Sequence, residues 1–419
     1  MAHLLMIESW VGASGRLLPP LLRSLGHTFT FVTRKTGHYE SAHSTERHPV
    51  LAEAREVLVT ETNDVAALIE FLRPKRFDGV ITVCDYYIET VQQVAAAFGL
   101  PCPFPTDVTT VRQKHRMREA LTAAGVANPA YRLTGSWEET RQAAAEIGYP
   151  LVMKAVDLAS SAFVNLVEDV EQLRSAYEAL EAFPLNFRDQ PRDRTVLLEA
   201  YMVGEEVSVE CVFDHGETTV IGVTDKSITG SPYFIENGHM FPAALSREQE
   251  AEVVEYVQAA LRAVGFDHGI AHTEVKLTAD GPRIVEINPR TPGNYIVELI
   301  ERVTGVDLLR AFVDLSLGER PQLQGEPTGA ASAAVMFLVP PQGGKIAELA
   351  GIDRLERDPH VVRHTLENCA GREVAAPIDN ACYLGHVVTE DREGAQARRY
   401  AEEALARAEL RYAGAGEPV

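Results

Sequence analysis

The sequence predicts an α/β protein of several structural units, and three observations support this prediction. Short apolar runs typical of β-strands alternate with helical stretches through residues 1–105, as they do in parallel α/β sheets. Two more such runs, HTEVKLTA and GPRIVEIN, meet at the Asp280–Gly281 pair like the arms of a β-hairpin. With 419 residues, 46% of them apolar, the chain can form roughly two to four units with hydrophobic cores.

The composition argues against several classes of protein. A formal net charge of −21 does not suit a nucleic-acid partner, because phosphate backbones are bound by basic surfaces. No apolar run approaches the roughly 18 residues of a membrane span, and the first residues, MAHLLMIES, lack the basic segment and cleavage site of a signal peptide. The five cysteines are scattered without a C-x-x-C pair, so we expect core thiols and no zinc or redox site. We therefore expect a cytoplasmic protein without nucleic-acid or membrane partners.

Residues 1–105 are predicted to form a parallel α/β unit. Its strands are HLLMIE, TFTFVT, REVLVT and GVITVC. Gly12 and Gly15 in VGASGRLL could form a phosphate loop, but the sequence matches neither G-x-G-x-x-G nor the lysine-bearing P-loop. A tight turn from strand to helix explains these glycines better. The segment PCPFP, residues 101–105, marks the end of the unit.

Two helices and a strand follow. KHRMREALTAAGV has one apolar helical face, and SWEETRQAAAEIG begins with a capping box of Ser136 and Glu139. The strand PLVMKAV then carries Lys154 on the same face as two valines. A lysine in this place either extends out of a partly exposed strand or has a function, and the sequence leaves both explanations open.

The next segment, TVLLEAYMVGEEVSVECVF, predicts a strand with one core face after a turn at Gly204. Its other face carries Glu206, Ser208 and Glu210, for which exposure to solvent is the ordinary explanation. Residues 224–245 show little apolar periodicity and are predicted as a long loop before a helix that begins at Ser246. Loops of this length inside a compact domain are often functional.

The predicted hairpin presents unusual polar side chains. After an apolar start, Glu286, Asn288 and Arg290 recur at every second position, so they project from one face. If the turn is centred near Asp280, Glu274 lies across from Glu286, although like charges in such positions destabilise a sheet. Two carboxylates and an amide oxygen would suit a hard cation such as Mg²⁺, and Arg290 would stabilise charge on a phosphoryl group or an oxyanion. A hairpin that faces solvent is the alternative.

The order of these motifs resembles the ATP-grasp superfamily. The motifs are Lys114, Lys154, LLEAYMVGEE, HTEVKL and VEINPR. The stretch TDKSITGSPYFIENGHMFP is similar to the L-amino-acid (dipeptide) ligase branch, and the similarity spans nearly the whole chain. It implies an α/β fold of the ATP-grasp type, which includes α+β parts. The implied units are an N-terminal α/β pre-ATP-grasp domain at 1–105, a small lobe with the phosphate loop at 106–195, a large lobe with the metal site at 196–324 and a C-terminal α+β subdomain at 325–419.

The resemblance also implies a role for each motif. ATP would be bound through its phosphates by Lys114, Lys154, Ser160 and Ser161, through adenine by the hinge residues Glu199, Ala200, Tyr201 and Met202, and through its ribose by Glu206. Two Mg²⁺ ions, with Mn²⁺ as an alternative, would be bound by Glu274, Glu286 and Asn288. The catalytic residues would be Arg290, Glu236 and His239, which together with Asn294 would bind the amino-acid substrates.

The activity that the resemblance implies is ATP-dependent ligation of a carboxylate to an amine. The carboxylate of an amino acid would be activated as an acyl phosphate, with ADP and phosphate released, and a second amino acid would supply the amine. One alternative is an ATP-grasp ligase that uses a carrier-protein thiol or a non-peptidic amine. Another, from a different class, is a nucleotide-binding module without turnover. ATP and amino acids are thus the expected partners, and a homodimer is left open.

One segment departs from the pattern of the superfamily. The loop after the second lysine is usually rich in glycine, but here it is DLASSAFV, residues 157–164, with no glycine. Ser160 and Ser161 can still donate hydrogen bonds to phosphate, whereas residues with a Cβ restrict φ. We therefore expect this loop to alter phosphate affinity without changing the fold.

Overall fold

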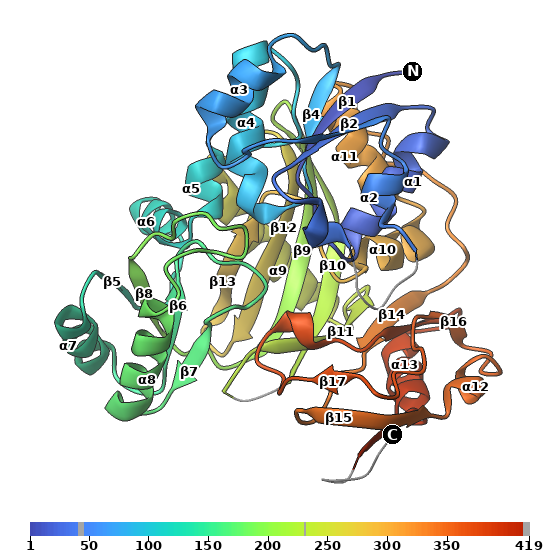
Figure 1. Ribbon diagram of the computed structural model, residues 1–419. Coiled ribbons are helices and arrows are strands. Elements are labelled where there is room, and N and C mark those ends of the chain that lie inside the picture. The colour runs from blue at the N-terminus through green and yellow to red at the C-terminus, as the bar shows by residue number, and fades with distance from the viewer. Residues whose placement is uncertain (41–45, 230–231, 414–419) are drawn as a thin grey trace.

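The computed structural model describes residues 1–40, 46–229 and 232–413, and the strands in these ranges form four sheets (Figure 1). The first sheet is entirely parallel, with the strand order β3-β2-β1-β4. Its strands are β1 (His3–Ile7), β2 (Thr28–Thr33), β3 (Glu56–Val59) and β4 (Gly79–Ile81), and the helices of the unit are α1 (Ser14–Ser24), α2 (Pro49–Ala52), α3 (Val65–Leu72) and α4 (Ile88–Phe98). The parallel α/β unit predicted at the N-terminus is confirmed.

The turn from β1 to α1 requires glycine at position 15. A Cβ on Gly15 would lie 1.9 Å from the carbonyl oxygen of Trp10, so no other residue fits this close approach. The tight turn predicted from VGASGRLL is therefore present. It leaves Trp10 beside the carboxyl ends of β1 and β4, the edge at which α/β sheets place their ligands.

The second sheet is antiparallel, in the order β5-β8-β6-β7. Its strands are β5 (Tyr131–Thr134), β6 (Leu151–Ala155), β7 (Asn165–Val167) and β8 (Val196–Ala200), and the helices α7 (Trp137–Ile147) and α8 (Val170–Glu181) pack on it. Ser136 caps α7 as predicted, but the Glu139 carboxylate accepts a hydrogen bond from the N–H of Gly135 and does not complete a capping box. Because β8 pairs with β5 and β6, we propose that the small lobe ends after Ala200 instead of at residue 195.

The third sheet has eight strands among the described residues, in the antiparallel order β13-β12-β9-β10-β11-β14-β18-β16. Its strands are β9 (Glu205–Asp214), β10 (Glu217–Thr229), β11 (Ile235–Phe241), β12 (Gly269–Thr278), β13 (Gly281–Asn288), β14 (Ser332–Phe337), β16 (Val361–His364) and β18 (His386–Asp391). The helices near it are α5 (Val108–Arg112), α6 (Lys114–Ala123), α9 (Arg247–Ala263) and α10 (Ile296–Thr304), whereas α11 (Leu308–Ser316) packs against α1 and β4 of the first unit.

The prediction of a long loop over residues 224–245 is wrong. Most of this segment forms the end of β10 and all of β11, while residues 230 and 231 lie outside the described ranges. Both strands bury polar side chains, among them Lys226 and His239, so the alternation of apolar residues expected of a strand is missing. The polar face of β9, for which solvent exposure was the ordinary explanation, is also buried. Glu206, Ser208 and Glu210 are at most 8% exposed.

The C-terminal residues continue the large sheet. The strands β14, β16 and β18 belong to the predicted C-terminal subdomain, yet β14 pairs directly with β11. The other C-terminal elements are α12 (Ile352–Leu355), α13 (Ala397–Leu405) and a sheet of β17 (Glu373–Val374), β15 (Gly344–Ala350) and β19 (Glu409–Tyr412). Hydrogen bonds of one sheet thus cross the predicted boundary at residue 325. Within the described ranges, no helix combines the length and the apolar character that crossing a membrane requires.

Candidate active site

A cavity of about 660 Å³ lies where the three larger sheets meet. Its walls come from the turn after β1, the loop after β6, the end of β8, the strands β10 to β13 and the C-terminal residues 380–386. The predicted site residues that line it are Lys114, Lys154, Ser160, Ser161, Glu199, Ala200, Tyr201, Met202, Glu206, Glu236, Glu274, Glu286, Arg290 and Asn294. His239 and Asn288 lie behind this surface, so the structure brings all but two of the predicted residues to one cavity.

The β12–β13 hairpin has the register that the sequence predicts. Glu274 of β12 pairs directly with Glu286 of β13. Asn288 donates a hydrogen bond of 3.0 Å from Nδ2 to Glu286 Oε1, and its amide oxygen accepts one of 3.4 Å from Arg290 NH2. Lys114, the first residue of α6, places its ammonium 2.8 Å from Glu286 Oε2. Burial alone would raise the pKa of Glu286, but the Lys114 charge and the hydrogen bonds outweigh it and hold that pKa far below its usual range.

Lys226 of β10 lies among three carboxylates. Its ammonium is 3.0 Å from Glu206, 3.3 Å from Glu236 and 2.9 Å from Glu274, and its side chain is only 1% exposed. Burial opposes the charge on Lys226, yet the three carboxylates raise its pKa well above the usual value. This lysine was not predicted, because it lay in the segment interpreted as a loop. Its position near the end of β10 connects the proposed metal, ribose and substrate residues.

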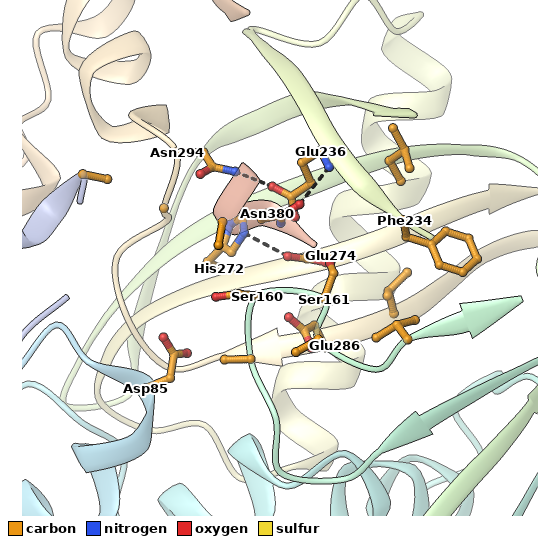
Figure 2. A pocket seen from close by; sticks show the side chains of 18 of the residues that line it. Asp85, Ser160, Ser161, Phe234, Glu236, His272, Glu274, Glu286, Asn294 and Asn380 are labelled. Atoms are coloured by element: carbon orange, nitrogen blue, oxygen red, sulfur yellow. Dashed lines mark hydrogen bonds and ion pairs between the residues drawn. The ribbon is translucent and has the colours of Figure 1, made fainter. Parts of the chain in front are cut away.

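His272 connects the same hairpin to β9. Its Nδ1 lies 2.9 Å from Glu210 Oε1. Its Nε2 lies 3.3 Å from Glu274 Oε1 (Figure 2). Burial would lower the pKa of His272, but the hydrogen bonds and charges of the two glutamates raise it to about 9. The imidazole is therefore charged at neutral pH and holds Glu274 in place.

The nucleotide end of the cavity is built around Glu199. Its carboxylate lies 2.6 Å from the Lys154 ammonium and 2.5 Å from Arg118 Nε. Burial lowers the pKa of Lys154 despite the neighbouring Glu199. Lys154 is thus buried and paired, so the explanation that it extends into solvent does not hold. Beside it, the ring of Tyr201 lies 6.4 Å from that of Phe234.

The substrate end contains Arg290 and Glu236. Arg290 Nε donates to Asp85 Oδ1 at 2.7 Å. Asn294 Nδ2 donates to Glu236 Oε2 at 2.6 Å (Figure 2). Burial would raise the pKa of Glu236, but Lys226 and then His239 hold it well below the usual range. His239 is completely buried on β11, with Nε2 3.3 Å from Glu236 Oε2. From its place behind the cavity surface, His239 therefore fixes the orientation of the Glu236 carboxylate.

The remaining wall is aromatic and comes from residues far along the chain. The rings of Phe337 and Tyr383 are stacked with centroids 4.3 Å apart, and the ring of His386 lies 4.2 Å from that of Tyr295. The Tyr383 hydroxyl donates to the carbonyl of Glu236 at 2.6 Å. Asp85 and these aromatic residues were missed in the sequence because no motif surrounds them.

The loop without glycine adopts backbone conformations that usually favour glycine. Ser160, Ser161 and Phe163 have φ values of 60°, 57° and 56°, which cost energy for residues with a Cβ. The loop is held by a hydrogen bond of 3.3 Å from the N–H of Ala159 to the Tyr86 hydroxyl and by one of 3.0 Å from Lys114 Nζ to the Leu158 carbonyl. Both serines line the cavity in this conformation.

Two protein-family models match the chain: the ATP-grasp domain over residues 147–298 and the L-amino acid ligase C-terminal domain 2 over residues 336–413. The protein y4rH of Sinorhizobium fredii is 32% identical over 81% of this chain and 70% of its own length. Carnosine synthase 1 of Homo sapiens and alanine–anticapsin ligase of Bacillus subtilis are 30% and 27% identical over 62% and 57% of this chain. The chain covers only 33% and 53% of the length of these two relatives. The solved structure of L-amino acid ligase from Bacillus licheniformis gives a TM-score of 0.82 over 99% of both chains at 21% identity.

The fold and the cavity together define an ATP-grasp protein. The chain belongs to the ATP-grasp superfamily, and its C-terminal part matches the domain of the L-amino acid ligases. The resemblance drawn from the sequence motifs is therefore confirmed, and so is the fold class. Members of this superfamily use ATP with Mg²⁺.

Proposed function

We propose that the protein is an ATP-dependent ligase that joins the carboxylate of one amino acid to an amine, most simply that of a second amino acid. The observation that carries the proposal is the composition of one cavity. It contains a buried lysine beside a hinge, a pair of facing carboxylates and an arginine beside a further carboxylate. Two relatives that are named for ligation reactions, a carnosine synthase and an alanine–anticapsin ligase, support this type of reaction.

ATP is proposed to lie along the cavity from the hinge to the hairpin. Because the Glu199 carboxylate is already paired with Lys154 and Arg118, adenine would contact the backbone of residues 199–202 and the rings near Tyr201. Glu206 would accept hydrogen bonds from the ribose hydroxyls. The phosphates would be bound by Lys114, Lys154, Ser160 and Ser161.

The donor set of the hairpin fits magnesium. Glu274, Glu286 and Asn288 offer the hard oxygen ligands that Mg²⁺ prefers, and the low pKa of Glu286 keeps its carboxylate ionised, as a ligand must be. We propose that these three residues bind two Mg²⁺ ions, with Mn²⁺ as a substitute. When bound, the ions would neutralise phosphate charge next to the substrate.

The reaction begins when a carboxylate oxygen of the first amino acid attacks the γ-phosphorus of ATP. A P–O bond forms, the bond to the β-phosphate oxygen breaks, and ADP leaves. The unprotonated amine of the second substrate then attacks the acyl carbon, so that a C–N bond forms and the C–O bond to phosphate breaks. The proton released from the nitrogen leaves with the phosphate. Arg290 would stabilise the negative charge on the reacting oxygens. Glu236, oriented by His239 and Asn294, would accept hydrogen bonds from a substrate ammonium group.

An ATPase assay with pooled amino acids tests the proposal. Turnover should require both Mg²⁺ and amino acids, and mass spectrometry should find ADP, phosphate and an amide product in equal amounts. AMP and pyrophosphate as products would contradict the roles given to the hairpin and Arg290. A phosphinate analogue of the amide-forming intermediate, phosphorylated in the site, should inhibit tightly.

Two alternatives give different products in the same assay. A ligase that uses a carrier-protein thiol or a non-peptidic amine would hydrolyse ATP only when that acceptor is added. A nucleotide-binding module would bind ATP and release no ADP with any acceptor. A cytoplasmic location and a homodimer stay predictions of the sequence.

A further inference from the structure

A short segment of the small lobe reaches across to the N-terminal unit. This docking segment, residues 185–191, lies in the connection between α8 and β8. Asp189 Oδ2 lies 2.9 Å from Arg34 NH2 and 2.7 Å from Lys35 Nζ. Asn63 Nδ2 donates to the carbonyl of Arg188 at 2.9 Å. The small lobe is thereby attached directly to the N-terminal unit.

Arg188 of the docking segment is buried against the N-terminal unit. It is only 7% exposed, its NH2 donates to the carbonyl of Ser9 at 2.9 Å, and its NH1 lies 2.9 Å from His38 Nδ1. The guanidinium carbon lies 5.4 Å from the centre of the Trp10 ring, a distance at which a cation is attracted to an indole. A buried guanidinium is costly unless contacts of this kind hold it. Arg188 therefore fixes one face of Trp10 while the segment is docked.

Trp10 continues the connection to the substrate end of the cavity. Its Nε1 donates to Asp85 Oδ2 at 2.9 Å. The other oxygen of Asp85 accepts from Arg290 Nε at 2.7 Å, and Asp85 is buried. Three successive contacts, through one indole and one carboxylate, thus join Arg188 of the small lobe to Arg290 of the large lobe.

We propose that Arg188 is a positioning residue that couples docking of the small lobe to the alignment of Arg290. In the docked state Arg188 fixes Trp10, Trp10 fixes Asp85, and Asp85 holds the Arg290 guanidinium. Loss of docking removes the cation from the indole face, loosens the Trp10–Asp85 hydrogen bond and frees Arg290 to move. Docking of the small lobe would therefore complete the substrate end of the cavity. The catalytic role of Arg290 rests on the proposed function, whereas the coupling is a property of the fold.

Arg192 provides a matched control in the same connection. It is also a buried arginine, but all the side-chain hydrogen bonds that it donates to described residues go to carbonyl oxygens of the small lobe. These acceptors belong to Leu180, Phe183 and Asp193. The variant Arg192→Ala should loosen the connection from within the lobe without reaching Trp10.

Hydrogen exchange of the full-length protein without ligands tests the coupling. In the peptide covering residues 288–298, Arg188→Ala and Trp10→Phe should each raise the exchange rate about tenfold. The double variant should exchange no faster than the faster single variant, because both changes break one chain of contacts. Arg192→Ala should leave this peptide within about twofold of the unchanged protein. If Arg188→Ala does not fold, Arg188→Lys serves as the milder variant and should give a smaller increase in the same peptide.

The coupling is overturned if Arg188→Ala speeds exchange only in the docking segment, or if Arg192→Ala affects residues 288–298 equally. Kinetics supply the second readout. Arg188→Ala should lower kcat and raise the KM for the amino acid by about tenfold each, with the KM for ATP within about twofold. Coupled exchange without any ATP-dependent turnover would refute the proposed function alone. Turnover with uncoupled exchange would refute the coupling alone.

Discussion

Lys226 determines how charge is balanced in the wall of the cavity. Glu206, Glu236, Glu274 and, behind them, Glu210 contribute four negative charges there, whereas Lys226, Lys276 and the protonated His272 contribute three positive charges. In a buried environment one surplus carboxylate attracts a further cation strongly. The ammonium group of a substrate or a metal ion would supply that cation. This group of residues is therefore suited to bind zwitterions and metal-bound phosphates, although the whole protein is acidic.

The first prediction concerns Glu286. Glu286→Gln keeps the size of the side chain but removes a charged ligand, so turnover should fall on the order of 100-fold or more. The circular-dichroism spectrum should not change, because the amide has nearly the shape of the carboxylate and its one oxygen can still accept a hydrogen bond from Lys114. Glu217→Gln, at a side chain that is 80% exposed, is the control and should retain full activity. Near-normal turnover in Glu286→Gln would contradict the metal assignment.

The second prediction concerns His239. Because it contacts Glu236 and Asn294 from behind the cavity surface, His239→Ala should leave Glu236 poorly oriented. We expect the KM for an amino-acid substrate to rise about tenfold and the KM for ATP to stay within about twofold. His239→Gln, which can restore one hydrogen bond, should recover part of the loss. Equal changes in both KM values would show that His239 does not act through the substrate end.

The third prediction uses the pKa of His386. Burial, and then the nearby Arg363 guanidinium, lower this pKa to about 4 from the usual 6.5. Between these values the unfolded chain binds a proton that the folded protein does not. The contribution of His386 to the free energy of unfolding is therefore fully present above pH 6.5, and about 3 kcal/mol of it is lost as the pH falls towards 4. Urea unfolding at pH 4.5 and 7.5 should show this loss in the unchanged protein and a smaller one in His386→Gln.

Residues of the site differ in how well their neighbours can be predicted from the sequence. Glu274 and Glu286 could be paired in advance, because a hairpin turn fixes the register of the two strands it joins. Asp85 and Lys226 could not, since each meets its partners only after distant strands assemble. An isolated acid or lysine has many structural explanations, and only the three-dimensional neighbours distinguish them. The sequence therefore predicted the pairing of the two hairpin glutamates but not the residues that surround them.

At the scale of elements, polar strands were the main source of error. The periodicity rule finds strands with one apolar face, and it identified β9 for that reason. β10 and β11 place charged residues on a buried face, and the same residues gave the segment the appearance of a loop. The loop 157–164 shows a related effect, because its left-handed residues are serines and a phenylalanine and no glycine marks the conformation.

The fourth prediction tests the junction between β11 and β14. A Cβ on Gly238 would lie 2.0 Å from Met336 Sδ and 2.9 Å from the Val335 carbonyl oxygen. Gly238→Ala should therefore lower the free energy of unfolding by about 2 kcal/mol, as overpacking usually does. Gly37→Ala is the control, since no atom lies within 4 Å of its Cβ position. Equal unfolding midpoints in urea for the two variants would show that β11 and β14 can move apart at position 238 without a loss in the free energy of unfolding.

At the scale of the whole molecule, the site depends on parts that are far apart in the sequence. The cavity takes walls from the N-terminal unit, the small lobe, the large sheet and residues 380–386. The order of the units could be predicted because each has its own local pattern, and the family resemblance supplied their arrangement. The continuity of one sheet across residue 325 could not, because pairing between β11 and β14 leaves no trace in either segment alone.

The fifth prediction follows from that continuity. A chain of residues 1–324 lacks β14, β16 and β18, so the backbone groups of β11 would form an open edge, and such edges pair with other chains. It also lacks Phe337, Tyr383 and His386, which form the aromatic wall beside Glu236. We expect this shortened chain to aggregate in size-exclusion chromatography, and addition of a fragment of residues 325–413 during refolding to restore a discrete species. A monomeric shortened chain with native-like circular dichroism would show that the large sheet is complete without its C-terminal strands. Amino-acid-dependent ATP hydrolysis by that monomer would also remove the aromatic wall from the substrate site.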